Sequence, residues 1–183
     1  MITYIIIAVV VVVGLWLVGM FNGLVRARNR VKESWSDINI QLRRRHDLIP
    51  NLLETVKGYA AHEKDVLEQV TKARTQAITA GSLAEKGQAE NMLSGALKNL
   101  FALAEAYPNL KANENFGKFQ DELTDTENKV QAARRFYNSN ALLLNTMVEQ
   151  FPMNLFAAMF GFAKEEFFQL ENPEEAKLPS VKF

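Results

Sequence analysis

Residues 116–151 read FGKFQDELTDTENKVQAARRFYNSNALLLNTMVEQF, and this stretch decides the fold class. Its inward positions recur at alternating steps of three and four residues over five heptads, the spacing of a long helix in a coiled-coil-like bundle. We therefore expect one helix from about residue 113 to 150, which Phe151-Pro152 ends. The expected inward positions are Phe116, Phe119, Leu123, Thr126, Val130, Ala133, Tyr137, Asn140, Leu144, Met147 and Phe151.

A second seam with the same spacing lies nearer the N-terminus, in residues 31–59. Only one of its positions is polar, and Arg45 occupies it. Pro50 removes a backbone hydrogen bond in mid-helix, so we expect a kink or a restart there, with Asp47 as the N-cap of the restarted helix. The apolar seam positions are Val31, Trp35, Ile38, Leu42, Ile49, Leu52, Val56 and Tyr59.

The remaining sequence also has helical spacing. Gly81-Ser82 separates two predicted helices, and Pro108-Asn109 ends the second of them. The further predicted helices span residues 62–80, 83–107 and 153–162. No stretch after residue 25 alternates apolar and polar residues as a strand would. The prediction is an all-α fold: an N-terminal transmembrane helix that continues into an antiparallel up-and-down bundle of about four helices, with a short C-terminal helix.

The N-terminal segment predicts a membrane anchor. Residues 1–25 contain no Asp, Glu, Lys or Arg, and an apolar helix of about 20 residues matches a hydrocarbon core of about 30 Å. A cleaved signal would need a basic start, a shorter apolar run and a small-residue cleavage site, so we expect the helix to be retained. The anchor positions include Ile2, Ile6, Val10, Trp16 and Phe21. The predicted layout is an anchor at 1–25, a bundle domain at 26–162, and a C-terminal segment at 163–183 that is largely irregular or disordered from 172.

Positive charge follows the anchor directly, at Arg26, Arg28, Arg30 and Lys32. The positive-inside rule therefore predicts an outside N-terminus and a cytoplasmic bundle in a bacterial inner membrane. The basic run could also contact anionic lipids, although its role in setting topology already explains it. Gly19 and Gly23 have the GxxxG spacing of a helix-dimer face, which a chance occurrence explains at least as well.

Several classes of chemistry are not expected from this composition. The chain has no Cys, which excludes disulfides, thiolate metal sites and Cys nucleophiles, and it has only two His. His62-Glu63 lacks the second His of a zinc-protease motif, and no Glu-x-x-His pair is present. A carboxylate-only metal site stays formally open. We predict no catalytic residue, no metal, no cofactor, no small-molecule substrate and no nucleic-acid partner.

Arg45 needs a partner if it lies inside the bundle, because an unpaired buried charge is costly. The candidates are Glu105, Glu127 and Asp47, and we interpret such a pair as a device that fixes helix register. Arg43, Arg44, Arg45 and His46 are successive helical residues that point in different directions, so they do not make one anion-binding patch.

The aromatic C-terminal stretch allows two interpretations. It could close the open end of the bundle, or it could be a docking or membrane-surface element with an exposed apolar face. The stretch includes Leu155, Phe156, Met159, Phe160, Phe162, Phe167 and Phe168.

Two long segments resemble the LemA family: NRVKESWSDINIQLRRRHDLIPNLLETVKGYAAHE at 29–63 and AEAYPNLKANENFGKFQDELTDTENKVQAARRFYN at 104–138. MVEQFPMNLFAAMFGF at 147–162 is similar to the family's C-terminal half. The resemblance implies a single-pass bacterial membrane protein with a cytoplasmic helical bundle. It also implies a scaffold or adaptor role, linked in some members with membrane-stress proteolysis and in one branch with magnetosome membranes.

The family's shared pattern implies structural rather than catalytic residues. They fall here on Trp35, Arg44, Arg45, Asp47, Leu48, Pro50, Asn51, Glu105, Tyr107, Pro108, Leu110, Glu127, Asn128, Arg134, Tyr137, Asn138, Phe151 and Pro152. We expect a non-enzymatic protein that self-associates or binds membrane-protein partners. The alternative is an envelope sensor or anionic-lipid-binding module that uses the basic run and the aromatic segment.

Overall fold

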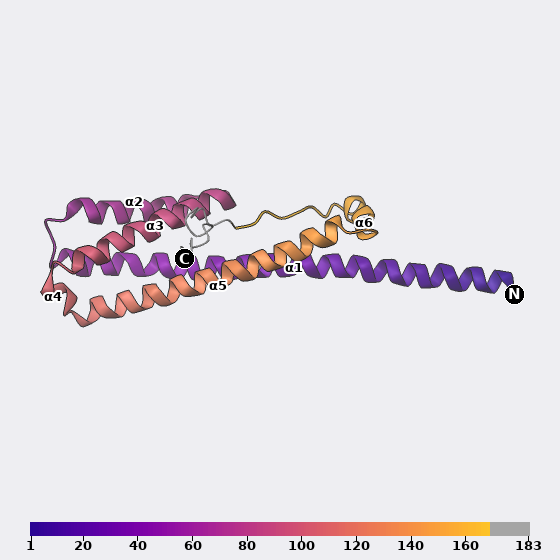
Figure 1. The fold of residues 1–183 in the computed structure, drawn as a ribbon, viewed down its shortest axis with the longest axis horizontal. Helices are drawn as coiled ribbons and strands as arrows, with labels where there is room; N and C mark the ends of the chain where they lie inside the picture. Colours follow the sequence, from indigo (N-terminus) through magenta and orange to yellow (C-terminus); the bar gives the residue numbers. More distant parts are fainter. Residues whose placement is uncertain (169–183) are drawn as a thin grey trace, which may run out of the picture. The chain divides into compact units, whose positions relative to one another are not determined.

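The computed structural model describes residues 1–168, and all regular elements in that range are α-helices (Figure 1). The all-α class predicted from the sequence is confirmed, and the long helices lie within a few residues of their expected bounds. The tail expected to be disordered from 172 lies outside the described residues. The helices are α1 (Ile2–Lys57), α2 (Lys64–Thr79), α3 (Leu83–Ala104), α4 (Pro108–Lys111), α5 (Glu114–Glu149) and α6 (Met153–Met159).

The chain divides into two compact units, and α1 and α5 each contribute to both. We call residues 1–39 with 131–167 the anchor unit, and residues 40–130 with Phe168 the bundle unit.

In the bundle unit, four helical segments surround one apolar core: residues 40–57 of α1, all of α2 and α3, and residues 114–130 of α5. Burying each leucine of such a core contributes about 1.5 to 3 kcal/mol. The fully buried core side chains are Ile49, Leu52, Val56, Val70, Ala77, Leu93, Leu100 and Leu110.

A capping box fixes the start of α3. The backbone N–H of Glu85 donates to Ser82 Oγ at 3.2 Å, and the Glu85 carboxylate accepts from the Ser82 backbone N–H at 3.1 Å. These backbone hydrogen bonds, from Ser82 first and Gly81 second, lower the pKa of Glu85. Gly81-Ser82 therefore separates α2 from α3 as expected, with Ser82 satisfying an otherwise open helix end.

The predicted helix restart near Asp47 is wrong, because α1 passes through Pro50 without interruption and Asp47 lies exposed in mid-helix. Pro50 cannot donate to the carbonyl of His46, four residues earlier. That carbonyl instead accepts a 2.8 Å hydrogen bond from Arg74 Nε of α2. A side chain from another helix thus supplies the missing donor, and the helix does not have to end.

Three further expectations need correction. Tyr59 follows the end of α1 and is exposed, and its hydroxyl accepts from Asn113 Nδ2 at 3.0 Å rather than packing in the seam. Phe151, expected inward, is 76% exposed because α5 has already ended at Glu149. Pro108 starts a helix instead of ending one, since its missing N–H costs nothing at a first helical position.

In the anchor unit, α1 and α5 lie antiparallel. The rings of Trp35 and Tyr137 are 5.8 Å apart at one end. At the other end, a Cβ on Gly23 would lie 3.4 Å from Met147 Cε. The buried residues between these contacts are Leu24, Ala27, Val31, Ser34, Asn140, Ala141, Leu144 and Asn145.

The chain then turns back along α5. Helix α6 ends in a Schellman motif, in which Gly161 has a φ of 69° and the Phe162 N–H donates to the Ala157 carbonyl at 2.9 Å. Past this turn, the Asn145 side chain makes two hydrogen bonds with the backbone of Glu165, at 2.8 and 2.9 Å. The segment after α6 is therefore held against α5 within the anchor unit.

Candidate functional site

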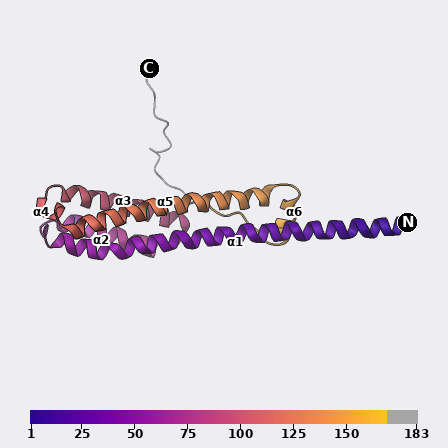
Figure 2. The ribbon, with the colours of Figure 1, turned by 90° about the horizontal axis from the view of Figure 1, so that it is seen from below.

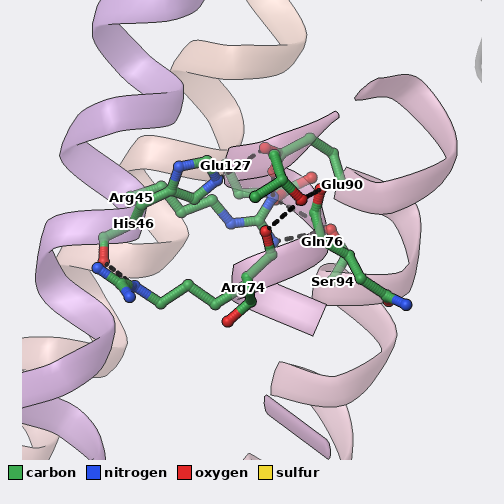
Figure 3. A network of polar contacts seen from close by, with 9 residues as sticks. Arg45, His46, Arg74, Gln76, Glu90, Ser94 and Glu127 are labelled. Carbon is green, nitrogen blue, oxygen red and sulfur yellow. Dashed lines mark hydrogen bonds and ion pairs between the residues drawn. The ribbon is translucent and has the colours of Figure 1, made fainter. Parts of the chain in front are cut away.

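The buried polar centre of the bundle unit is built around Arg45 (Figure 3). Arg45 Nη1 lies 2.9 Å from Glu127 Oε2 and 3.3 Å from Glu90 Oε2, and Nη2 donates to Ser94 Oγ at 2.8 Å. Arg45 is only 3% exposed, so these contacts replace the water that a charged guanidinium would otherwise bind.

Glu90 is the second centre of this network. Its side chain is 0% exposed, and both carboxylate oxygens are occupied: Oε2 by Arg45, and Oε1 by His46 Nε2 at 2.7 Å. A buried carboxylate is tolerated when both of its oxygens have such partners, because a buried charge without a partner is costly. Arg45 and His46 therefore act together on one residue of α3.

The network joins all four helical segments of the bundle unit. Arg45 and His46 come from α1, Glu90 and Ser94 from α3, and Glu127 from α5. Helix α2 joins through Arg74, which binds the carbonyl of His46. These side-chain contacts therefore connect the four helical segments to one another through a single buried polar network.

The sequence predicted one of the Arg45 partners. Glu127 is confirmed, whereas Glu105 instead pairs with exposed Lys111 and Asp47 points to solvent. Glu90 was missed. A signal for it exists, since Glu90 lies three residues before Leu93 and so occupies the inward stripe of α3. An acidic residue on the apolar stripe of one helix is a suitable ion-pair partner for Arg45, which lies on the apolar seam of another helix.

The expectation that Arg43 to His46 form no single patch agrees with the structure. Arg43 and Arg44 are exposed, while Arg45 and His46 are buried. Arg44 makes a long ion pair of 3.8 Å with Asp125 on the surface. Such exposed pairs contribute about 0 to 1 kcal/mol.

The other residues of the family pattern are spread over the molecule. Trp35, Arg134, Tyr137 and Asn138 belong to the anchor unit, where Tyr137 donates to the backbone carbonyl of Glu166 at 2.9 Å. Burial, with Glu165 and then Glu166 nearby, raises the pKa of Tyr137. In the bundle unit, Leu48 is half-buried and Leu110 is buried, and the exposed pattern residues are Asp47, Pro50, Asn51, Glu105, Pro108 and Asn128.

Tyr107 links the two ends of the α2–α3 region of the bundle unit. Its hydroxyl donates to Glu63 Oε1 at 2.8 Å, which raises the pKa of Tyr107. This contact ties the residue before α2 to the residue before α4, which gives Tyr107 of the family pattern a structural role.

The anchor unit presents a long apolar surface. Helix α1 is long and apolar enough at its N-terminal end to cross a membrane, by length and composition, and only 6% of that window is buried. The N-terminal part of α1 projects beyond α6 in both ribbon views (Figures 1 and 2). The anchor residues exposed there include Ile2, Ile6, Val10, Trp16 and Phe21.

Basic residues follow this surface on the same helix. Arg26, Arg30 and Lys32 are exposed, whereas Arg28 is half-buried with its guanidinium carbon 4.9 Å from the centre of the Phe162 ring. Among residues 1–168, no group of three or more His, Asp and Glu side chains is arranged to hold a metal ion.

Comparisons with known proteins agree with this architecture. The model of the LemA family matches residues 34–183. Protein LemA of Metamycoplasma hominis is 27% identical over 161 residues, which cover 86% of this chain and 72% of that protein. Magnetosome protein MamQ 2 of Paramagnetospirillum magneticum is 23% identical over 175 residues, which cover 81% of this chain. Magnetosome protein MamQ of Magnetospirillum gryphiswaldense is 21% identical over 174 residues, again covering 81% of this chain. This chain spans 64% of the length of each of these two MamQ proteins. With a family match over most of its length, the chain belongs to the LemA family.

Proposed function

We propose that this protein is a single-pass, membrane-anchored helical scaffold or adaptor, without an active site, that acts by self-association or by binding other membrane proteins. Membership of the LemA family supports the proposal, as does the resemblance to proteins named for the magnetosome. A role in membrane stress or proteolysis is part of the same proposal.

The observation that carries it is the exposed apolar run from Ile2 to Phe21. The run is helical throughout and belongs to the same helix that supplies Arg45 and Ile49 to the bundle unit. In water, such a surface would be strongly unfavourable, whereas a helix satisfies its own backbone groups in a bilayer. One helix thus serves as both anchor and bundle element.

The ion network supports a structural rather than catalytic role for the charges inside the bundle unit. Arg45, His46, Glu90 and Glu127 are engaged with one another in ion pairs and hydrogen bonds. The proposed layout remains an anchor at 1–25 and a bundle at 26–162, with partners recognised by the outer surface of the bundle.

Orientation is tested by introduced cysteines, since the chain has none of its own. We expect Thr3→Cys to react with an impermeant maleimide in intact cells or spheroplasts, and Glu122→Cys to react only after lysis. The basic residues after the span support this arrangement through the positive-inside rule. The reverse pattern would place the bundle outside and overturn the inner-membrane, N-outside assignment.

Partner binding is tested by cross-linking in the native membrane, followed by mild detergent extraction and mass spectrometry. A homo-oligomer or a reproducible membrane-protein partner is expected. The matched control carries an unrelated apolar helix of equal length in place of residues 2–21, which separates recognition by the bundle from crowding by the anchor. A monomer with no cross-linked partner in either form would count against a scaffold.

Anionic-lipid recognition is the second candidate, and the exposed side chains of Arg26, Arg30 and Lys32 favour it. Each basic residue near an anionic surface contributes about 1 kcal/mol. We compare the anionic lipid retained by the purified full chain with that retained by the Arg26→Gln/Arg30→Gln/Lys32→Gln variant. Lys72→Gln/Lys98→Gln/Lys118→Gln is the charge-matched control. Equal retention in all three proteins removes this candidate.

A further inference from the structure

We infer that residues 150–163, which contain α6, form a second membrane-contact element that inserts into the lipid interface beside the anchor. The inference rests on the proposed membrane anchoring and assigns a lipid surface to an apolar face of the anchor unit.

The first observation is where this segment packs. The Phe21 ring meets the Phe160 ring edge-on, with centroids 5.0 Å apart, and the Phe162 ring at 6.0 Å. Phe21 ends the apolar run that begins at Ile2. The Phe160 and Phe162 rings therefore lie where a spanning helix would leave the hydrocarbon core, which is the level at which interfacial aromatic residues reside.

The second observation is an apolar stripe that nothing in the described chain covers. Leu155 and Met159 lie one turn apart on α6 and are 60% and 73% exposed, and Phe151, which precedes the helix, is 76% exposed. Phe160 adds a further half-exposed ring. On the other face, Ala157 and Phe162 are buried. Helix α6 is thus apolar both on the side that packs and on the side that faces outward, which a surface in water would not favour.

The third observation is the charge boundary. No Asp, Glu, Lys or Arg occurs from residue 150 to 163. The charged residues on either side, Glu149 and Lys164, form an exposed ion pair across the base of the loop. The ion pair thus encloses a segment with no charge of its own, in which Phe160 and Phe162 contact Phe21 of α1.

These observations select lipid over a protein as the occupant. The apolar stripe is continuous with the exposed apolar surface of α1 through the Phe21–Phe160 contact, so one bilayer would cover both. Arg28 stacks on Phe162 about two helical turns after Phe21, where a guanidinium would meet lipid phosphates. A second copy of the chain is the competing occupant and is one outcome of the test.

The test measures depth in the full chain. Single cysteines at Leu155→Cys and Met159→Cys carry a polarity-sensitive fluorophore, and the protein is reconstituted in phosphatidylcholine–phosphatidylglycerol nanodiscs with lipids spin-labelled at defined depths. Val10→Cys serves as the anchor control, and Met92→Cys, an exposed apolar position of the bundle unit, serves as the water control. We expect the labels at 155 and 159 to lie about 5 to 10 Å below the headgroup level.

The outcomes separate the two proposals. If Val10→Cys is quenched but 155 and 159 behave like Met92→Cys, the anchor holds and the interfacial element is refuted. If Val10→Cys is not quenched either, membrane anchoring itself fails. If 155 and 159 are shielded from water without lipid quenching, and the shielding is lost on dilution to one chain per disc, a second copy covers the stripe and the inference is wrong.

Discussion

Arg74 Nε donates a 2.8 Å hydrogen bond to the backbone carbonyl of His46, the carbonyl that Pro50 leaves without its usual donor within α1. The contact turns a helix-breaking residue into a link between α1 and α2. Pro50 and Arg74 are far apart in sequence, and the Arg74 side chain supplies the hydrogen bond that Pro50 cannot donate.

The loss of stability on replacing Arg74 should therefore depend on whether position 50 is a proline. We expect Arg74→Met to lower the free energy of unfolding by about 1 to 2 kcal/mol, because the partly buried carbonyl of His46 loses a charged donor. In a Pro50→Ala background the loss should shrink, since the substituted alanine restores the intrahelical N–H. The measurement is a double-mutant cycle by chemical denaturation of the detergent-solubilised chain, with exposed Lys72→Met as the control. Equal costs in both backgrounds would show that the contact with His46 does not replace the missing bond.

Glu90→Gln should be among the most damaging isosteric changes in the bundle unit. The substitution removes one of the two carboxylates that contact Arg45 and leaves Glu127 as its ion-pair partner, so we expect the free energy of unfolding to fall by about 1 to 3 kcal/mol. Thermal unfolding followed by circular dichroism measures the loss. Glu122→Gln, which changes an exposed residue of α5, should be nearly neutral. A loss below about 1 kcal/mol for Glu90→Gln would mean that the charge of Glu90 contributes little to the stability of the bundle unit.

Gly23 faces α5, which bears on the GxxxG spacing of the anchor. A Cβ at position 23 would meet Met147 Cε at 3.4 Å, whereas a Cβ at Gly19 would meet nothing within 4 Å. We expect Gly19→Leu to leave self-association unchanged, because its neighbour Gly23 is already used inside the anchor unit. Cross-linking yield in the membrane measures this, with Gly14→Leu as the control. A selective loss of dimer in Gly19→Leu would assign the spacing to a helix-dimer face.

Alkaline pH should weaken the fold through Tyr137. Its pKa in the folded chain is raised above the ordinary 10.0, chiefly by burial. The neutral ring's contribution to stability is therefore complete below pH 10.0 and is lost as the pH rises through the folded-state pKa. Unfolding midpoints measured from neutral pH upward should therefore decrease once the pH exceeds 10.0. The fall should be shallower in Tyr137→Phe than in the exposed-ring control Tyr59→Phe, and identical slopes would contradict it.

The helices were predictable because their signals are local. The seam in residues 116–151 and the break at Gly81-Ser82 are signals from neighbouring residues, so helix type and approximate bounds follow from them. Errors occur where a distant residue decides the outcome. The continuation of α1 through Pro50 depends on Arg74 of α2. The sequence around Pro50 does not indicate this contact, and neither does the sequence around Arg74.

The polar centre was half predictable for the same reason. Arg45 stands out as a break in its seam, and that makes a buried partner necessary but does not name it. Glu127 and Glu105 each lie near a helical seam, and only the way the helices pack separates them. Glu90 occupies the inward stripe of α3 and would have been found by treating every charged seam residue alike. The contacts of Phe21 with Phe160 and Phe162 join residues near opposite ends of the sequence and carry no local signal.

Since Glu90 uses both of its oxygens on α1 while Arg45 also contacts Glu127 of α5, separating α1 from α3 breaks buried ion pairs, and separating α2 from α1 removes the donor to the His46 carbonyl. Unfolding of a single helix is therefore disfavoured relative to unfolding of the whole bundle unit. The slowest amide protons of α2, α3 and the adjoining part of α1 should accordingly exchange with solvent at one common rate, as a single cooperative block.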